Sequence, residues 1–338
     1  MKIGVLGTGN IVKSITKTLN GMENMECYAI ASRTKERAEQ AAKELGYETA
    51  YGSYEELVQD PLVELVYIAT PHSRHFEDMK LCISHKKPVL CEKAFTLNST
   101  QAKEIKSLAE EKGVYVAEAI WTRYMPSRQI INDILASGIL GKVTTLTANL
   151  SYTACGKARI MQPELAGGAL LDLGVYGINF AMMHFGEDIV RMESSVQMTD
   201  TGVDGMESIT LHYGDGRMAV LTHSIYSRSD RKGIFHGDKG YMIVENINNP
   251  QSVSVYDWND TLVQSTAVPE QITGYEYQFA EGAECIAAGE IQSRSMPLED
   301  SIKVMEVMDA LRAQWGFVYP QETSETLKTV TDANGQCP

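Results

Sequence analysis

Residues 1–12 read MKIGVLGTGNIV, a short apolar run that leads directly into a turn with two glycines. Gly7 permits a tight turn after a strand, and Gly9 lets a pyrophosphate approach the backbone. The helix that follows offers free N–H groups and a positive dipole to the phosphates. Val12 replaces the third glycine of the usual fingerprint, so a plain glycine turn is the alternative interpretation. We expect the phosphates of a dinucleotide at Gly7, Thr8, Gly9, Asn10 and Ile11.

Apolar runs and amphipathic stretches alternate through the first 120 residues. The runs begin at Ile3, Cys27, Val63, Lys87 and Val114. Strands that read as nearly continuous apolar runs are buried on both faces, and their alternation with helices indicates a parallel sheet. The sequence therefore predicts an α/β protein whose residues 1–120 form a Rossmann domain that binds NADP.

The pattern changes after Trp121, where longer segments alternate between polar and apolar residues. These segments lie at residues 143–152, 208–214, 217–227 and 252–258, with a hairpin signal, GDGR, at residues 214–217. We expect residues 121–338 to form an α+β domain, built on a large, mostly antiparallel open sheet, that binds substrate and mediates oligomerisation. The apolar residues Val220, Leu221 and Ile225 predict that another subunit covers one face of this sheet.

Composition narrows the classes of partner. The chain has 338 residues and a formal net charge of −14, so it lacks the basic character that nucleic acid and anionic membranes require. No signal peptide opens the chain, and no apolar run reaches the length of about 18 residues that a membrane span needs. The six cysteines are scattered, as in a reducing compartment, and the seven histidines form no metal-binding cluster. We expect a cytoplasmic protein with a small-molecule substrate and no metal.

The end of the second expected strand bears on the choice of cofactor. NAD-binding chains usually place an acidic residue there to hold the ribose 2′-hydroxyl. Here Ser32 and Arg33 follow the strand, with Arg37 behind them. A hydroxyl followed by arginine suits a 2′-phosphate, because arginine forms charge-assisted hydrogen bonds with phosphate. We expect NADP, with NAD as the second option and a solvated basic patch as the alternative interpretation.

Two further strand ends are expected to line the cofactor cleft, because ligands of open α/β sheets bind beyond the carboxyl ends of the strands. ATPHSRHFE at residues 69–77 supplies Thr70, Pro71 and His75, and CEK at residues 91–93 supplies Glu92 and Lys93. Lys93 would point at the nicotinamide edge and at a substrate hydroxyl, where burial makes a lysine a usable proton donor or acceptor. A structural Glu–Lys pair is the alternative.

A third motif, GGALLDLGVYGIN, covers residues 167–179. Asp172 and Tyr176 are four residues apart, so they share one face if this segment is a helix. A tyrosine can pass a proton to or from a substrate oxygen, and an aspartate can orient it. An apolar core helix with an early acidic residue is the alternative. We expect Lys93, Asp172 and Tyr176 to converge at the nicotinamide end of a cleft between the two domains.

Taken together, these motifs resemble the glucose–fructose oxidoreductase/inositol dehydrogenase (Gfo/Idh/MocA) family. GTGNIV, ATPHSRHFE, CEKAFTLN, EAIWTRYMP and ELAGGALLDLGVYGIN occur in the family's order and cover residues 1 to about 180. The last two are most similar to the subgroup that contains dimeric dihydrodiol dehydrogenase and NADP-linked D-xylose dehydrogenase. The resemblance also implies a homodimer or homotetramer.

The resemblance implies roles for individual residues. Lys93 matches the family's catalytic lysine, and Asp172 and Tyr176 match the catalytic positions of the substrate-domain helix. Substrate-lining positions are implied for Trp121, Arg123, Arg159 and Tyr176. Ala94 stands where the family usually has proline, which leaves the geometry of the Lys93–Ala94 peptide open, cis or trans.

The expected reaction moves a hydride between the nicotinamide C4 and a carbinol carbon of a sugar or vicinal diol. Lys93 or Tyr176 would take up the hydroxyl proton during oxidation, while the cofactor carries the redox chemistry. Two alternatives are a catalytically silent dinucleotide sensor, against which the retained Lys93, Asp172 and Tyr176 argue, and an NAD-dependent glycosidase. The sequence leaves the substrate, the physiological direction and the order of the oligomer open.

Overall fold

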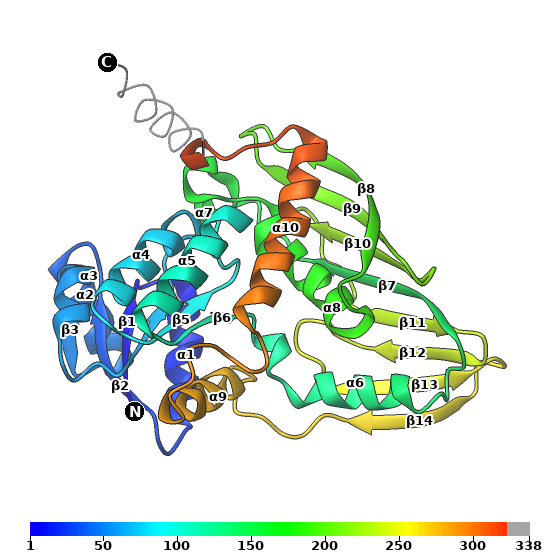
Figure 1. Ribbon diagram of the computed structural model, residues 1–338, viewed down its shortest axis with the longest axis horizontal. Coiled ribbons are helices and arrows are strands. Elements are labelled where there is room, and N and C mark those ends of the chain that lie inside the picture. The colour runs from blue at the N-terminus through cyan, green and yellow to red at the C-terminus, as the bar shows by residue number, and fades with distance from the viewer. Residues whose placement is uncertain (323–338) are drawn as a thin grey trace.

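Two sheets form the frame of the computed structural model, which describes residues 1–322. The first is a six-stranded parallel sheet in the order β3-β2-β1-β4-β5-β6 (Figure 1). Five helices accompany it in the alternation that the apolar runs predicted, so the expected N-terminal Rossmann sheet is confirmed. Only β3 was not expected, because a three-residue strand leaves almost no periodic signal. The strands are β1 Lys2–Leu6, β2 Glu26–Ala31, β3 Thr49–Tyr51, β4 Leu65–Ile68, β5 Val89–Glu92 and β6 Val116–Ala119. The helices are α1 Asn10–Asn20, α2 Lys35–Leu45, α3 Tyr54–Gln59, α4 His72–Ser84 and α5 Ser99–Lys112.

The second sheet has eight strands in the order β14-β13-β12-β11-β7-β10-β9-β8. Only β7 and β10 pair in parallel, so the expected mostly antiparallel sheet is also confirmed. β8, β11, β12 and β14 were not expected; β11 and β12, for example, are five residues long and begin with glycine, which weakens a strand signal. The strands are β7 Val143–Ser151, β8 Ile189–Met198, β9 Asp204–Tyr213, β10 Met218–Ser224, β11 Gly233–Gly237, β12 Gly240–Val244, β13 Ser252–Asp257 and β14 Leu262–Ala267.

One face of the large sheet is covered by helices and the other is not. Helix α8 (Val175–Phe185) packs on β7 and β10, and α10 (Leu298–Trp315) contacts β8 and also reaches α5 and β6 (Figure 1). Leu221 and Ile225 point toward these helices and are fully buried, whereas Val220 lies on the uncovered face. The expectation that all three residues mark an exposed face is therefore wrong for Leu221 and Ile225, since successive strand residues alternate between faces.

The segment that carries Asp172 begins as a π-helical turn, Leu170–Gly174, and continues as α8. The sequence predicted a single uniform helix, and a π turn has no signature in apolar periodicity. The stretch Pro163–Phe185 is long and apolar enough to span a membrane, but 94% of its apolar 18-residue window is buried inside this fold, as in a core helix.

The core of the parallel sheet includes residues from the far end of the chain. Helix α9 (Glu276–Ala287), which was not expected from the sequence, places Phe279 and Cys285 in one apolar cluster with Ile3, Val5 and Leu90. Just after this helix, Gln292 forms an isolated parallel bridge with Val116 of β6. Residues beyond 275 therefore complete the packing of a sheet whose strands all lie before residue 120.

Other short elements join these parts. They are the 3₁₀ turns Trp121–Arg123 and Pro163–Leu165, helix α6 Pro126–Ala136 and helix α7 Ala158–Met161. Helix α6 has Pro126 at its first position, where proline is tolerated.

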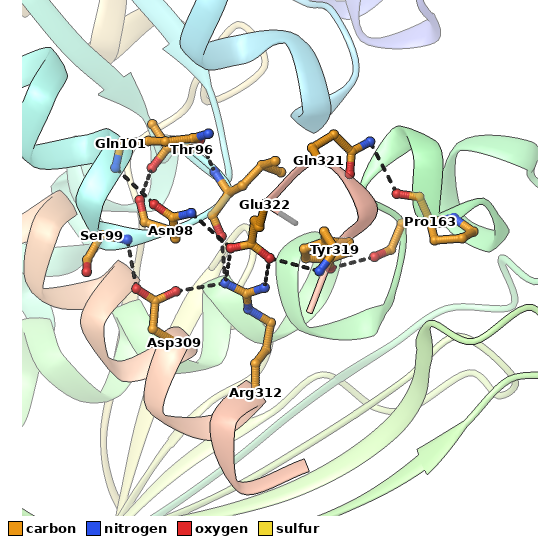
Figure 2. Close-up of polar contacts among 12 residues, drawn as sticks. Thr96, Asn98, Ser99, Gln101, Pro163, Asp309, Arg312, Tyr319, Gln321 and Glu322 are labelled. Carbon is orange, nitrogen blue, oxygen red and sulfur yellow. Dashed lines mark hydrogen bonds and ion pairs between the residues drawn. The ribbon is translucent and has the colours of Figure 1, made fainter. Parts of the chain in front are cut away.

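A cluster of buried polar contacts, the C-terminal anchor, ties the end of the described chain to both halves of the molecule (Figure 2). Arg312 of α10 donates to Glu322 at 2.6 Å and to the carbonyl oxygen of Leu97 at 3.0 Å. The Tyr319 hydroxyl donates to the carbonyl oxygen of Gly167 at 2.7 Å. The anchor thus connects the loop that follows Lys93 with the loop that precedes Asp172.

Replacing Arg312 with methionine should destabilise the protein strongly, because it removes the guanidinium that pairs with the nearly buried Glu322 carboxylate. Removal of one partner of a buried ion pair costs about 3–5 kcal/mol. Lys103→Met is a matched control, since Lys103 of α5 pairs with Glu306 of α10 on the exposed surface. Urea unfolding curves of both variants provide the measurement. Equal, small losses of stability would show that the anchor is not a stabilising element.

Candidate active site

The first glycine turn has the shape that a pyrophosphate requires. Gly7 adopts a left-handed φ of 102°, and a Cβ at this position would lie 2.8 Å from the carbonyl oxygen of Ala69, so only glycine fits. Gly9 precedes α1, and no side chain caps the first turn of that helix. Gly9 and Asn10 are exposed, and Thr8 and Ile11 are partly exposed. The turn and the uncapped helix start fit the diphosphate of a dinucleotide.

Basic side chains gather at the end of β2. Arg33 and Arg37 are exposed, and neither guanidinium forms a hydrogen bond or ion pair with the residues that the structure describes, whereas Ser32 is buried at the strand end. Burial raises the pKa of Tyr54, and Arg33, Arg74 and Arg37 all act against that rise. The three guanidinium groups therefore lie near one tyrosine. Arg74, which also pairs with Asp78, was not singled out in the sequence.

The three expected catalytic side chains meet in one place. Lys93, directly after β5, donates from Nζ to the carbonyl oxygen of Asp172 at 2.7 Å and to its Oδ1 at 3.0 Å. The same Nζ lies 5.0 Å from the centre of the Tyr176 ring. The side chains of Lys93 and Asp172 are 11% and 9% exposed. The expected convergence is thus present, and the Lys93–Ala94 peptide bond beside it is cis.

Asp172 is paired twice. Arg159 donates from Nη1 to Asp172 Oδ1 at 2.8 Å, and its guanidinium remains half exposed. Burial would raise the pKa of Asp172, but the charges of Lys93 and Arg159 outweigh burial and hold this pKa well below its usual value. The carboxylate is therefore ionised at neutral pH, while half of the Arg159 side chain still faces solvent.

Tyr176 holds its proton firmly. Burial raises the pKa of Tyr176 well above its usual value, and nearby Tyr275, Glu92 and Asp172 raise it further. A phenol with a raised pKa is present as the neutral hydroxyl at neutral pH and is able to donate a proton to a substrate oxygen.

An aromatic wall stands beside this group. The rings of Trp121 and Tyr275 are stacked with centres 4.0 Å apart and planes 13° apart. Trp121 also donates from Nε1 to Asn248 Oδ1 at 3.2 Å. Trp121 was expected at the site, whereas Tyr275 and Asn248 were not. Asn248 lies in the loop between β12 and β13, and Tyr275 directly precedes α9. No motif or periodicity in the sequence distinguishes them.

His75 does not lie where the sequence predicted. Its side chain is fully buried, Nδ1 is 2.8 Å from the carbonyl oxygen of Ala94, and Nε2 is 3.0 Å from that of Thr70. Both ring nitrogens are occupied by backbone, so the expectation of a direct cofactor contact through this ring is wrong. His75 instead fixes the backbone that follows Lys93. The Thr70 hydroxyl is likewise committed, since it donates to Asp78 at 2.7 Å, and Pro71 precedes α4 with a partly exposed surface.

Arg123 also departs from its expected position. The residue is 3% exposed, with Nε 2.9 Å from Asn179 Oδ1 and Nη1 2.7 Å from Asp300 Oδ2. These contacts hold α8 against α10, so the expectation that Arg123 touches substrate is wrong.

Burial raises the pKa of Glu92, which accepts a hydrogen bond from Tyr67 and is 9% exposed. Among residues 1–322, no three His, Cys, Asp or Glu side chains are placed to hold a metal ion.

Comparisons with known proteins agree with this geometry. The family model described as the Gfo/Idh/MocA oxidoreductase family with an NAD-binding Rossmann fold matches residues 1–119, and the Gfo/Idh/MocA C-terminal domain matches residues 129–243. Two relatives, both named trans-1,2-dihydrobenzene-1,2-diol dehydrogenase, come from Mus musculus and Danio rerio. Each is 31% identical to this chain, over 95% and 96% of its length and 99% of the relative's.

Among solved structures, a 3-ketoreductase from Actinomadura kijaniata in complex with NADP and TDP-benzene is 25% identical. It superimposes with a TM-score of 0.84 over 93% of this chain and 97% of that one. An aldose-aldose oxidoreductase from Caulobacter crescentus, 20% identical, shares the fold with a TM-score of 0.82 over 94% of this chain and 98% of that one.

Proposed function

The chain belongs to the Gfo/Idh/MocA family of oxidoreductases, and we propose that it transfers a hydride between NADP and a carbinol carbon of a sugar or vicinal diol. The family and the named relatives make it an NAD(P)-dependent enzyme that acts on CH–OH groups. The observation that carries the finer proposal is the contact of Lys93 with both Asp172 and Tyr176.

The nicotinamide supplies the hydride acceptor or donor when it is bound. In the direction of reduction, Tyr176 donates its phenolic proton to the carbonyl oxygen as the carbon receives the hydride. The Lys93 ammonium lies beside the Tyr176 ring and then returns a proton to the phenolate, which leaves Lys93 as the neutral amine. Oxidation is the reverse: the phenol passes its proton to the neutral Lys93 amine, and Tyr176 takes up the proton that the substrate hydroxyl releases. Asp172 keeps Lys93 in place, because it accepts from Nζ through both its carboxylate and its carbonyl oxygen.

Substrate specificity in this proposal comes from the aromatic wall and from Arg159. The Tyr275 ring, which is partly exposed and stacks on the buried Trp121 ring, offers a flat apolar surface to the C–H face of a sugar or cyclic diol. The half-exposed guanidinium of Arg159 offers hydrogen-bond donors to substrate hydroxyls on the side that faces solvent. A flat ring with vicinal hydroxyls matches both surfaces.

The catalytic proposal predicts that Lys93→Met loses most turnover while it still binds cofactor. A positioned proton-transfer group is worth about 100- to 10,000-fold in rate. Tyr176→Phe should lose turnover as well, and Lys103→Met, an exposed lysine of α5, is the control. The measurement follows nicotinamide absorbance with a panel of sugars and vicinal diols, alongside cofactor titration. Cofactor binding without turnover on any substrate would favour a silent sensor, and release of a leaving group without net redox change would favour a glycosidase.

The preference for NADP rests on Arg33 and Arg37, which lie exposed at the end of β2. A charged hydrogen bond of this kind contributes about 1.5–3 kcal/mol, so Arg33→Ala should weaken NADP binding about tenfold or more and change NAD binding little. Arg191→Ala, on the exposed strand β8, is the control. Titration of each variant with both cofactors measures the effect. Tighter binding of NAD than of NADP by the unaltered protein would contradict the preference.

We propose the cytoplasm as the location and small molecules as the partners, without nucleic acid or membrane. Among the described cysteines, Cys27, Cys82, Cys91 and Cys285 are buried free thiols and Cys155 is an exposed one, which suits a reducing compartment. The sixth, Cys337, lies outside the described residues.

A homodimer or homotetramer is proposed from the uncovered face of the large sheet. Val220, Thr147, Ile234 and Ile243 are directly aligned across β10, β7, β11 and β12, and all four are partly exposed. Three apolar side chains in one row suit burial against a second copy of the chain.

Light scattering at micromolar concentration should therefore give at least two protomers for the unaltered chain and one for Ile234→Lys. A buried charge without a partner is costly at such an interface. Val190→Lys, at the sheet edge, should leave the assembly intact. A monomer at every concentration would rule out this use of the face.

A further inference from the structure

Three ionisable side chains lie buried behind the turn that carries Asp172, and the chemistry described above uses none of them. Asp204 and Glu207 belong to β9 and His223 to β10, with exposures of 0%, 2% and 1%. Glu207 and His223 are directly opposite each other across the two strands, and His223 Nδ1 lies 3.1 Å from Glu207 Oε1. We call these three residues the buried cluster.

The buried cluster contacts the catalytic turn through a direct hydrogen bond. Asp204 Oδ2 accepts from the backbone N–H of Leu170 at 2.5 Å. Leu170 is the first residue of the π-helical turn, and Asp172 follows it by two residues. The first N–H groups of a helix have no partner within the helix, so a carboxyl group from another strand here acts as its cap.

Three glycines of the motif at residues 167–179 give the backbone access to the buried cluster. An added Cβ would overlap Asp204 Oδ1 at Gly168 and His223 Nε2 at Gly177, and at Gly174 it would lie 2.6 Å from Glu207 Oε1. Each glycine thus faces one member of the cluster. The helix backbone rests directly on these side chains, so their position determines where the turn lies.

Burial favours the neutral form of each member of the cluster. Burial raises the pKa of Asp204 to about 8 and that of Glu207 to about 8, and it lowers the pKa of His223 to about 3. The other ionisable groups that face Asp204 are Tyr226 and Tyr319, which are neutral phenols. A neutral acid needs no counter-ion, so it can remain beneath an active site that is already rich in charge.

We propose that Asp204, with Glu207 and His223 beside it, is a positioning residue. It fixes the π-helical turn so that the backbone carbonyl oxygen and the carboxylate Oδ1 of Asp172 face Lys93. This inference rests on the proposed function for its effect on rate, whereas its effect on the Lys93–Asp172 contact is independent of any substrate. It also gives a reason for the spacing of Gly168, Gly174 and Gly177, which a plain core helix does not require.

The test compares Asp204→Asn, which keeps a neutral side chain and a hydrogen-bond acceptor, with Asp204→Ala, which removes the cap. In the Ala variant we expect kcat to fall about 10- to 100-fold, because small displacements of reacting groups cost that much. The dissociation constant for NADPH should stay unchanged, and the Asn variant should recover most of the rate. Ser208→Ala, on the opposite face of β9, is the control. Asp204→Ser provides a milder truncation if the Ala variant does not fold.

A second readout needs no turnover. Lys93 should react slowly with acetic anhydride in the unaltered protein, since Asp172 holds its ammonium, and faster in Asp204→Ala, with mass spectrometry locating the modified lysine. Asp172→Asn gives the upper limit of that reactivity. An unchanged kcat and unchanged Lys93 reactivity in folded Asp204→Ala would overturn the inference. Changed reactivity in a protein that turns over no sugar or diol would instead overturn the proposed function and leave the inference standing.

Discussion

The rest of this molecule depends on the pairing of Lys93 with Asp172. Lys93 directly follows β5 of the parallel sheet, and Asp172 lies in the π-helical turn that leads into α8 on the large sheet. The pair therefore joins the two halves, which the C-terminal anchor and other polar contacts also connect. Both side chains are nearly buried, and separating them would leave an uncompensated charge away from water. The two sheets therefore have one favourable arrangement, and that arrangement also brings Tyr176 and Arg159 to the same carboxylate and ammonium.

Residues far from the motifs fix the backbone on both sides of this pair. His75 and Arg312 bond to carbonyl oxygens just after Lys93. Asp204 accepts a hydrogen bond from the backbone within the π-helical turn, and Tyr319 donates one to the backbone just before that turn. The motifs thus supply the chemical groups, whereas buried polar side chains from other strands and helices set their positions. Such groups are expensive to bury unless their hydrogen bonds are made, so each one also selects a single backbone arrangement.

The sequence was sufficient for features with local signals. Gly7 and Gly9, the apolar strands and the end of β5 predicted the Rossmann sheet and the place of Lys93, and spacing in a helix predicted that Asp172 and Tyr176 share a face. The sequence could not predict features that depend on contacts between residues far apart in the chain. The motif around His75 predicted a histidine near the end of β4. It did not predict that two backbone carbonyl oxygens would lie against the ring nitrogens. Tyr275 and the π turn depend on packing between halves, which no local pattern records.

The path of helix α9 has a consequence for how the chain is made. Phe279 and Cys285 fill part of the apolar core beneath β1 and β5. A chain that emerges from the ribosome in order completes all six parallel strands more than 150 residues before α9 appears. During this interval the apolar surface that Phe279 and Cys285 later cover stays exposed on the nascent parallel sheet. Exposed apolar surfaces of this kind promote misassembly during synthesis. The N-terminal half of this protein therefore reaches its final burial only after residues 276–287 have been translated.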